Sequence, residues 1–184
     1  GALKNTSGSN TWSGPIQLTS STTIDSEAGR LTIDVATGNA ITGNYNLVVS
    51  GAGATYIKDR IFIGTGSITK IDSGILVLES TNSYSGGTVI NSGTLAAAAS
   101  AGQVGTFMGG QPITVNGGGT LQFNIGDAIG YAAGAPSVIN VNGGLVTVTN
   151  SGNFRVTLPS LNMSGGRVSG IVGNGGDAFG NYLL

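Results

Sequence analysis

The stretch TKIDSGILVLESTNSYSGGTVINSGTLAA, from Thr69 to Ala97, decides the fold of this chain. Short steps of alternating apolar residues are separated in it by turns of Gly, Asn and Ser, and weaker copies recur along the rest of the sequence. Apolar residues two apart lie on the same face of a β-strand. Self-similarity at this spacing predicts a solenoid, in which each repeat is one coil that must stack on its neighbours to bury its apolar face.

The repeated unit has the form Gly-x-Leu-x-apolar, and from Gly74 to Gly166 its copies begin 19, 26, 24 and 23 residues apart. No window keeps a 3.6-residue periodicity, so we expect little or no α-helix. The sequence therefore predicts an all-β solenoid of about eight coils, forming one continuous domain over residues 1–184. Two stretches that depart from the pattern, residues 50–66 and 124–137, are expected to be bulges or longer loops on the rod.

The composition excludes several classes of function. Only 8% of the residues are charged and the net charge is −1, so there is no basic excess to neutralise the phosphates of a nucleic acid. The absence of Cys and His rules out a disulfide scaffold, a Cys/His zinc site, a thiol nucleophile and a Ser-His-Asp triad. No apolar run is long enough for a membrane-spanning helix, and we expect no membrane insertion by this segment and no cofactor.

The segment STNSYSGGTVINSGTL (80–95), which follows KIDSGILVL (70–78), closely resembles the passenger-associated repeat of autotransporter passengers. The residues that carry this repeat motif are Gly74, Leu76, Leu78, Asn82, Tyr84, Gly86, Gly87, Thr88, Ile90, Gly93, Thr94 and Leu95. The resemblance implies a right-handed parallel β-helix, export, and display at the surface of a bacterial cell. In the family, the repeat is thought to help secretion and passenger folding, and it has no catalytic residues.

Two groups of charged residues are candidates for a site. Lys58, Asp59 and Arg60 form the only dense charge cluster, which we interpret as a surface loop that could contact a ligand. Its two cations could also grip an acidic sugar or abstract a proton, as in β-helical polysaccharide lyases. Asp25 and Glu27 are two residues apart, as in a glycosidase pair, but we expect them to form a solvated face because no other acid is placed to join them.

Three glycine-rich or threonine-rich motifs are weaker candidates. The loop from Tyr84 to Thr88 lacks the Lys and the following helix of a phosphate-binding loop, so we interpret it as a corner between coils, with Tyr84 packed on its neighbours. The Gly175–Asp177 segment is a single, incomplete calcium-binding nonapeptide, and we assign it no metal. Thr147 and Thr149 would suit ice binding only if most coils carried such a pair, which they do not.

Three functions remain open. We expect a non-catalytic extracellular segment of a bacterial surface or secreted protein, acting as a stalk or adhesin, with surface glycans or further copies of itself as partners. Neither end of the sequence carries a polar cap, so we also expect it to be a segment of a longer repeat protein. The second possibility is a filament subunit stacked end to end, and the third is a polysaccharide-active enzyme.

Overall fold

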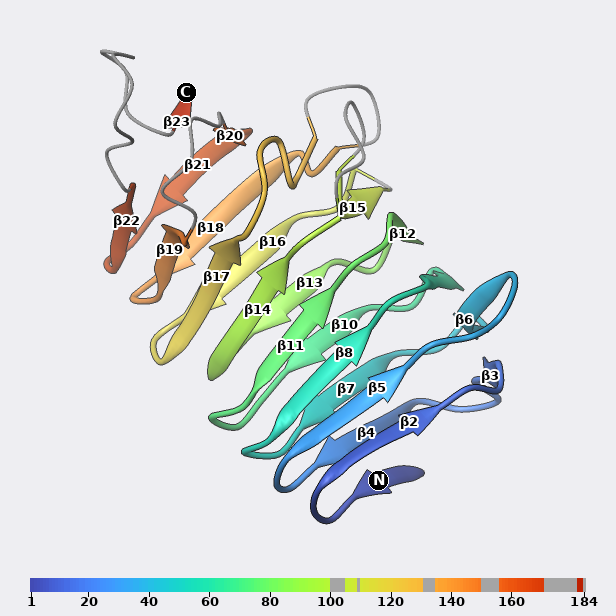
Figure 1. The fold of residues 1–184 in the computed structure, drawn as a ribbon. Coiled ribbons are helices and arrows are strands. Elements are labelled where there is room, and N and C mark those ends of the chain that lie inside the picture. The colour runs from blue at the N-terminus through green and yellow to red at the C-terminus, as the bar shows by residue number, and fades with distance from the viewer. Residues whose placement is uncertain (100–104, 109, 131–134, 150–155, 171–181, 184) are drawn as a thin grey trace.

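The computed structural model describes residues 1–99, 105–108, 110–130, 135–149, 156–170 and 182–183. None of these residues lies in a helix, so the part of the chain that the structure describes contains no candidate membrane-spanning helix. Its strands are stacked like the rungs of a ladder, from the N-terminus at one end of the molecule to β22 (Arg167–Ser169) near the other (Figure 1). The prediction of an all-β solenoid is confirmed.

Two sheets of eight parallel strands run along the solenoid, and a third sheet of five strands lies beside them. Sheet A is formed, in order, by β1 (Leu3–Asn5), β4 (Thr22–Ser26), β7 (Leu47–Ser50), β10 (Ile68–Lys70), β13 (Thr88–Ile90), β16 (Ile113–Asn116), β18 (Val138–Asn142) and β21 (Ser160–Met163). Sheet B is formed by β2 (Ser9–Trp12), β5 (Arg30–Ile33), β8 (Ala54–Ile57), β11 (Ile75–Leu78), β14 (Gly93–Ala97), β17 (Gly119–Phe123), β19 (Leu145–Val148) and β22. Sheet C is formed by β3 (Ile16–Gln17), β6 (Asn39–Thr42), β9 (Arg60–Gly64), β12 (Asn82–Tyr84) and β15 (Phe107–Met108). A separate pair joins β20 (Val156–Thr157) to β23 (Tyr182–Leu183).

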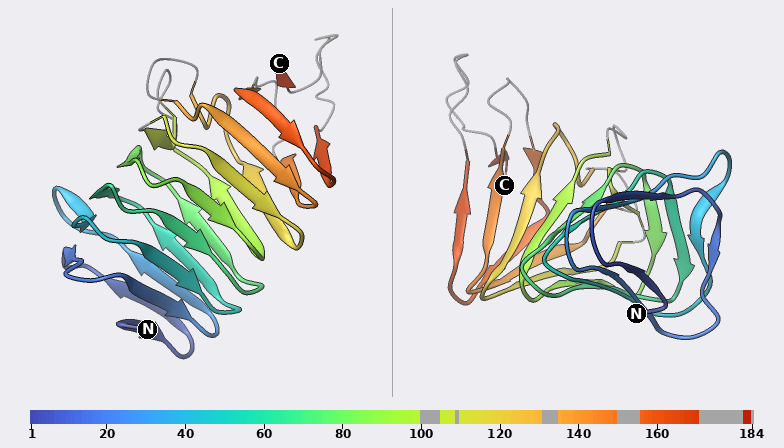
Figure 2. Two further views of the ribbon diagram at one scale, coloured as in Figure 1. Left: turned by 180° about the vertical axis from the view of Figure 1, so that it is seen from behind. Right: turned by 60° about the horizontal axis from the view of Figure 1, so that its bottom comes forward.

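Each coil begins with a strand of sheet A, continues into sheet B and, in the first five coils, passes through sheet C. We number the coils 1 to 8 by their sheet A strands, so that seven turns of the chain connect the first strand to the last. The right-hand view of Figure 2 shows the coils winding around a common interior. The pairing is parallel and in register: Val49 lies beside Lys70, which is 21 residues later, and Val115 beside Val141, which is 26 residues later.

The interior is built from columns of side chains that occupy the same position in successive coils. One column of sheet B consists of Ile33, Ile57, Leu78, Ala97, Phe123 and Val148. All six are at most 1% exposed, and each of the four inner members is covered on both sides by its neighbours in the column. Burial of this kind contributes about 25 cal/mol for each Å² of apolar surface removed from water, and no single coil could achieve it alone.

The expectation of a bulge or loop over residues 50–66 is wrong. This stretch contains β8 and β9, which pair in parallel with the strands of coils 2 and 4. In β9 the buried Ile61 and Ile63 alternate with the exposed Phe62, which is the normal pattern of a half-buried strand. The charged residues between β8 and β9 are typical of a loop, and for this reason the sequence pattern did not predict the two short strands. Residues 124–130 and 135–137, in contrast, contain no strand, as expected of a longer loop.

Glycines at the corners allow the coils to approach closely. Gly93, at the start of β14, has a φ of +69°, and a Cβ built there would lie 2.3 Å from the Asp72 carbonyl oxygen of the preceding coil. Gly38 has a similar φ of +86°, but a Cβ there would meet nothing within 4 Å. Both glycines therefore adopt a left-handed backbone conformation, but only Gly38 has room for a side chain.

We predict that Gly38→Ala costs about 1–2 kcal/mol, which is the strain of a left-handed backbone. Gly93→Ala should destabilise the solenoid by clearly more, because the methyl group must also push apart two stacked coils. Urea unfolding of both variants measures the difference. Equal losses would mean that the close approach of the coils at Gly93 has no energetic weight.

Candidate functional site

The Lys58–Arg60 cluster lies at the turn between β8 and β9, where its first two residues bind the preceding coil. The Lys58 ammonium donates to Asp34 Oδ2 at 2.6 Å, and this hydrogen bond raises the pKa of Lys58 above its usual value. The Asp59 carboxylate accepts a hydrogen bond of 2.8 Å from the backbone N–H of Val35. Lys58 and Asp59 thus fasten coil 3 to coil 2, and neither is left without a partner.

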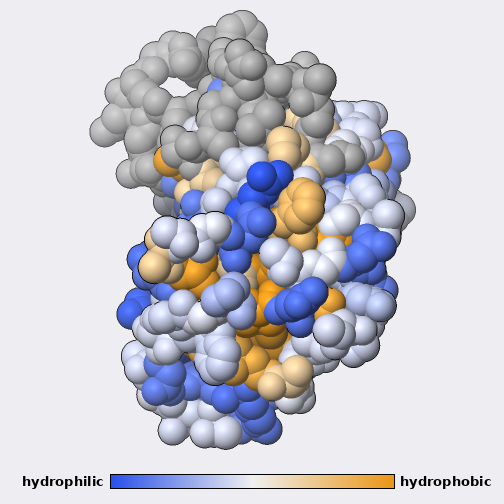
Figure 3. All heavy atoms as spheres, turned by 90° about the vertical axis from the view of Figure 1, so that its right-hand side faces the viewer, coloured by the Kyte–Doolittle hydropathy of each residue, from blue (hydrophilic) through white to orange (hydrophobic). Residues whose placement is uncertain are grey.

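Arg60, the last residue of the cluster, lies on the same outer face of β9 as Phe62. The Arg60 guanidinium lies 5.2 Å from the centre of the Phe62 ring, within the range of a cation–π contact. Phe62 is 46% exposed on the outer side of sheet C. Figure 3 shows this side of the molecule, where apolar side chains are visible between hydrophilic ones. The resulting surface is an aromatic face supported by a cation.

Asp25 and Glu27 both lie next to a lysine of the preceding coil. Both carboxylates lie against the ammonium of Lys4 in coil 1, at 3.8 Å from Asp25 and 2.5 Å from Glu27. Asp25 also accepts a hydrogen bond of 3.0 Å from the Ser50 hydroxyl of coil 3. The contact with Glu27 raises the pKa of Lys4. This arrangement joins three coils at the surface and places one ammonium beside both carboxylates.

The structure offers no metal centre among the residues that it describes. No group of three or more Asp or Glu side chains gathers there in a way that could hold a metal ion. The weak calcium motif at residues 175–177 lies outside the described residues. The Thr149 hydroxyl donates to Asn124 Oδ1 at 2.8 Å in the neighbouring coil, which is again a contact between coils.

Three polar residues of the repeat motif, Asn82, Tyr84 and Thr88, are buried in the solenoid. Asn82 is 1% exposed, and its Oδ1 accepts a hydrogen bond of 2.8 Å from the backbone N–H of Ile61 in coil 3. Its Nδ2 donates to the carbonyl of Ser80 at 2.8 Å and to that of Thr106 in coil 5 at 3.1 Å. One amide therefore links three successive coils.

Tyr84 ends the same strand and is 2% exposed. Its hydroxyl and that of Thr88, four residues later, are 2.7 Å apart and share a hydrogen bond. Burial raises the pKa of the Tyr84 hydroxyl well above its usual range. Gly87, with a φ of +89°, turns the chain between them, and strand β13 follows instead of a helix. The prediction of a corner between coils, with Tyr84 packed on its neighbours, is confirmed.

The other residues of the motif form the scaffold around these two. Leu76, Leu78, Ile90 and Leu95 are fully buried, and the motif glycines lie at corners. Gln111, outside the motif, is also buried, at 3% exposure. These residues of the motif thus build the interior of the solenoid.

Lys70 is a buried charged residue of the interior that the sequence analysis did not identify. It lies in an inward column between Val49 and Ile90 and is only 1% exposed. Its ammonium donates to the carbonyls of Ile71 and Asp72, the latter at 2.8 Å, at the corner between sheets A and B. Burial lowers the pKa of Lys70 to about 8, although the nearby Asp72 carboxylate opposes the shift. The alternation of Ile68, Thr69 and Lys70 was the available signal, because it places Lys70 on the buried face.

We predict that Asn82→Ala lowers the free energy of unfolding by about 2–4 kcal/mol, because it removes the side chain's hydrogen bonds and leaves the buried N–H of Ile61 unpaired. Asn91→Ala is the matched control. Asn91 is exposed and accepts one hydrogen bond, of 2.7 Å, from Asn116 in the next coil. Its loss should cost less than about 1 kcal/mol. Urea denaturation compares the two variants, and similar losses would contradict the linking role of Asn82.

The lowered pKa of Lys70 predicts that the free energy of unfolding depends on pH. Between about pH 8 and pH 10.5 the unfolded chain keeps a proton on Lys70 that the folded chain has released. Stability should therefore rise with pH across this window, and be lowest and flat with respect to this group below about pH 8. Lys70→Met should remove this part of the rise. Urea unfolding across the window tests it, and identical slopes for both proteins would refute it.

Comparison with known protein families adds two findings. The model of the passenger-associated-transport-repeat matches residues 68–97. In the structure this match begins at β10 and ends with β14, so it covers one whole coil and the sheet A and sheet B strands of the next. The buried links at Asn82, Tyr84 and Lys70 all lie within it.

The chain is also similar to the adhesin BmaC autotransporter of Brucella suis biovar 1 (strain 1330), with 32% identity over 148 residues. The alignment covers 64% of this chain but only 4% of that protein, so the chain spans a small part of the relative. No solved structure matches. The resemblance seen in the sequence is thereby confirmed: this chain is a β-solenoid with a passenger-associated-transport-repeat, similar to part of an autotransporter adhesin.

Proposed function

We propose that the chain is a non-catalytic segment of an autotransporter passenger, displayed outside a bacterial cell, which acts as a rigid stalk and carries adhesive contacts on its lateral faces. This proposal rests on the contacts that the charged candidate residues make. Their side chains join neighbouring coils, as seen for Asp25 and Glu27 with Lys4 and for Lys58 and Asp59. The relative named as an adhesin supports the adhesive part of the proposal.

The stalk function follows from the way in which the coils are joined. Seven coil-to-coil steps of about 4.8 Å give a rod of roughly 34 Å. Continuous ladders of backbone hydrogen bonds, the buried columns and the links at Asn82 and Lys58 hold successive coils at fixed spacing. Such a rod can hold a binding surface away from the cell without any hinge.

The absence of catalysis is supported by the same contacts. A glycosidase needs two carboxylates free to act on opposite sides of a glycosidic bond, whereas Asp25 and Glu27 share one lysine. A lyase would need a cation available to accept a proton from the sugar, whereas Lys58 is already bound to Asp34. The polysaccharide-active alternative therefore finds no assembled acid–base group at these residues.

For the adhesive contact we favour the Arg60–Phe62 surface. An exposed aromatic ring offers a flat apolar face, and the guanidinium beside it adds hydrogen-bond donors. This combination suits a glycan, which presents both apolar ring faces and hydroxyl groups. Of the original Lys58–Arg60 cluster, Arg60 is thus the residue that we place at the ligand, while Lys58 and Asp59 hold the turn that positions it.

We predict that a screen of glycans and host-matrix proteins will find a ligand, and that Phe62→Ala will weaken its binding about tenfold, or about 1.4 kcal/mol. Ser83→Ala is the matched control, because Ser83 lies beside Phe62 in the next strand of sheet C and should leave affinity unchanged. No binding in the screen would remove the adhesin function and leave the stalk. Release of unsaturated or reducing ends from a polysaccharide, abolished by Lys58→Ala or Arg60→Ala, would refute the non-catalytic proposal.

A further inference from the structure

Three asparagines and a serine lie one above another at the corner between sheets A and B in coils 5 to 8. Asn116 Nδ2 donates to Asn91 Oδ1 at 2.7 Å, and Asn142 Nδ2 donates to Asn116 Oδ1 at 3.3 Å. The Ser164 hydroxyl of coil 8 continues the row by donating to Asn142 Oδ1 at 2.9 Å. We call these four residues the amide ladder. It lies at the surface of the solenoid, where water reaches its side chains.

Two members of the amide ladder, Asn116 and Asn142, are each followed directly by glycine. A glycine has no side chain to keep its own backbone nitrogen away from the preceding residue. A Cβ at Gly117 would meet nothing within 4 Å, and one at Gly143 nothing closer than 3.5 Å. Gly117 also lacks a positive φ, so neither the backbone nor the packing requires glycine there. The surroundings of both Asn-Gly bonds are therefore open.

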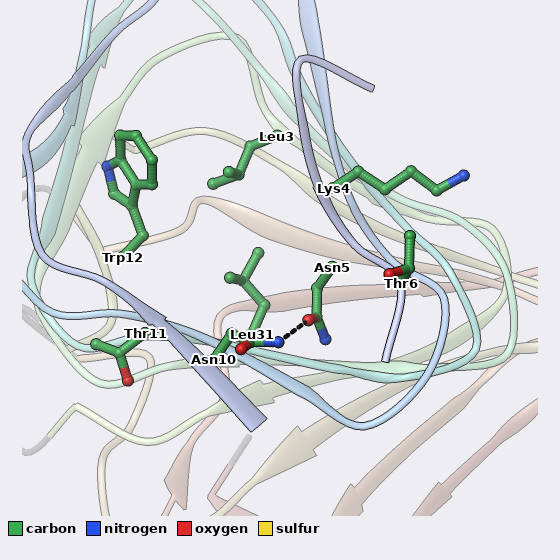
Figure 4. A pocket seen from close by; sticks show the side chains of 8 residues that line it. All are labelled: Leu3, Lys4, Asn5, Thr6, Asn10, Thr11, Trp12 and Leu31. Carbon is green, nitrogen blue, oxygen red and sulfur yellow. Dashed lines mark hydrogen bonds between the residues drawn. The ribbon is translucent and has the colours of Figure 1, made fainter. Parts of the chain in front are cut away.

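Other asparagines with similar amide contacts are followed by larger residues. Figure 4 shows Asn10 Nδ2 donating to Asn5 Oδ1 at 2.6 Å in coil 1, where each asparagine precedes a threonine. In sheet A, Asn162 Nδ2 donates to Asn140 Oδ1 at 3.0 Å, and the residues that follow them are methionine and valine. These larger neighbours hinder an attack of the backbone on the side-chain amide, so the chain contains its own reference asparagines.

We propose that Asn142 is a site of spontaneous deamidation, at which the side-chain amide becomes a carboxylate without any enzyme. The deprotonated backbone nitrogen of Gly143 forms a bond to Asn142 Cγ, the Cγ–Nδ2 bond breaks, and Nδ2 leaves as ammonia. Water then opens the cyclic imide at either of its two carbonyl carbons, which gives aspartate or isoaspartate. The reaction consumes one water for each ammonia released and needs no oxidant or reductant. This inference goes beyond the proposed function and does not depend on it.

Asn142 should react before Asn116, although both precede glycine. The hydrogen bond that Asn142 donates is longer, at 3.3 Å against 2.7 Å, so it restrains the amide less. Asn142 is also exposed, whereas Asn116 is half-buried. Both differences leave the Asn142 side chain freer to turn its Cγ toward the nitrogen of Gly143.

The product changes the hydrogen bonds of two further coils. A carboxylate only accepts hydrogen bonds, so position 142 can no longer donate to Asn116 Oδ1. The Asn116 amide must then rotate to present its Nδ2 to the carboxylate, and the Asn91 amide must rotate in turn to donate to Asn116. One reaction in coil 7 thereby reverses the direction of the ladder as far as coil 5.

The new charge is large for this part of the chain. After Glu79 the sequence has only four charged residues, which balance: Asp127, Arg155, Arg167 and Asp177. One deamidation gives these residues an excess negative charge at neutral pH, where an aspartate is ionised. The surface of coils 5 to 8 would therefore change with the age of the molecule, without any other protein acting on it.

Peptide mass spectrometry tests the site during incubation of chain 1–184 at mildly alkaline pH. Fragmentation must locate each reaction, because Asn174, outside the described residues, is also followed by glycine. We expect Asn142 to deamidate at least about tenfold faster than Asn140 and Asn162, which corresponds to a barrier lower by about 1.4 kcal/mol. Asn142→Gln keeps an amide at this position and should abolish the reaction there, because the longer side chain closes a ring less readily.

Side-chain amide NMR tests the reversal of the ladder. In Asn142→Asp, hydrogen exchange of the Asn91 side-chain NH₂ should slow severalfold, because Asn91 Nδ2 becomes a donor to Asn116. Asn140→Asp is the matched control, since it adds the same charge to the same strand, β18, but outside the ladder. It should leave the exchange at Asn91 unchanged.

Each part of the proposal has a result that contradicts it. Equal rates at Asn142, Asn140 and Asn162 would show that the following glycine and the open corner have no effect, and would remove the site. Faster reaction at Asn116 than at Asn142 would refute the order inferred from the ladder. Equal effects of the two Asp substitutions on Asn91 would show that the ladder does not reverse. None of these results bears on ligand binding at Phe62, which has its own test.

Discussion

The whole structure depends on the parallel pairing of each coil with the next. A single coil has three short strands at most and no enclosed interior, so its apolar side chains become buried only when the same positions of two neighbouring coils cover them. The register between neighbouring coils must therefore be fixed, because a shift of one residue would move the inward side chains of a strand to the outer face. The close contact at Gly93 and the amide of Asn82 both act on register, the first by removing a methyl group from the contact and the second by bonding three coils at once.

This constraint explains where the polar residues lie. Exposed charges such as Lys4 and Lys58 bridge successive coils along the surface, and the buried amide of Asn82 does so inside. The buried Lys70 is unusual because its ammonium turns back to carbonyls of its own corner. The passenger-associated-transport-repeat thus contains, in this protein, a cluster of connections between coils 3, 4 and 5, and the side chain of Asn82 that makes them is buried.

The fold was largely predictable from the sequence, because the alternation of apolar residues and the spacing of the Gly-x-Leu steps both follow directly from strands stacked in coils. Residues 50–66 were misread because Lys58 and Asp59, which join β8 to β9, and Arg60, the first residue of β9, together resemble a loop until the partner coils are known. The links made by Asn82 were not predictable, since they depend on which residues 20 or more positions away share the interior. Phe62 was equally hidden, because only the pairing of β9 shows that it faces outward.

The direction of the hydrogen bonds has a mechanical consequence. Because the strands run across the rod, their ladders lie along its axis, and tension on the two ends would load the interfaces between coils in series. The weakest interface would then separate first, and each coil of 20 to 26 residues released would lengthen the chain by roughly 70–90 Å at about 3.5 Å per residue. A solenoid of this kind would lengthen in steps under tension, so that part of the work of a sudden pull would be absorbed before all the coils have separated.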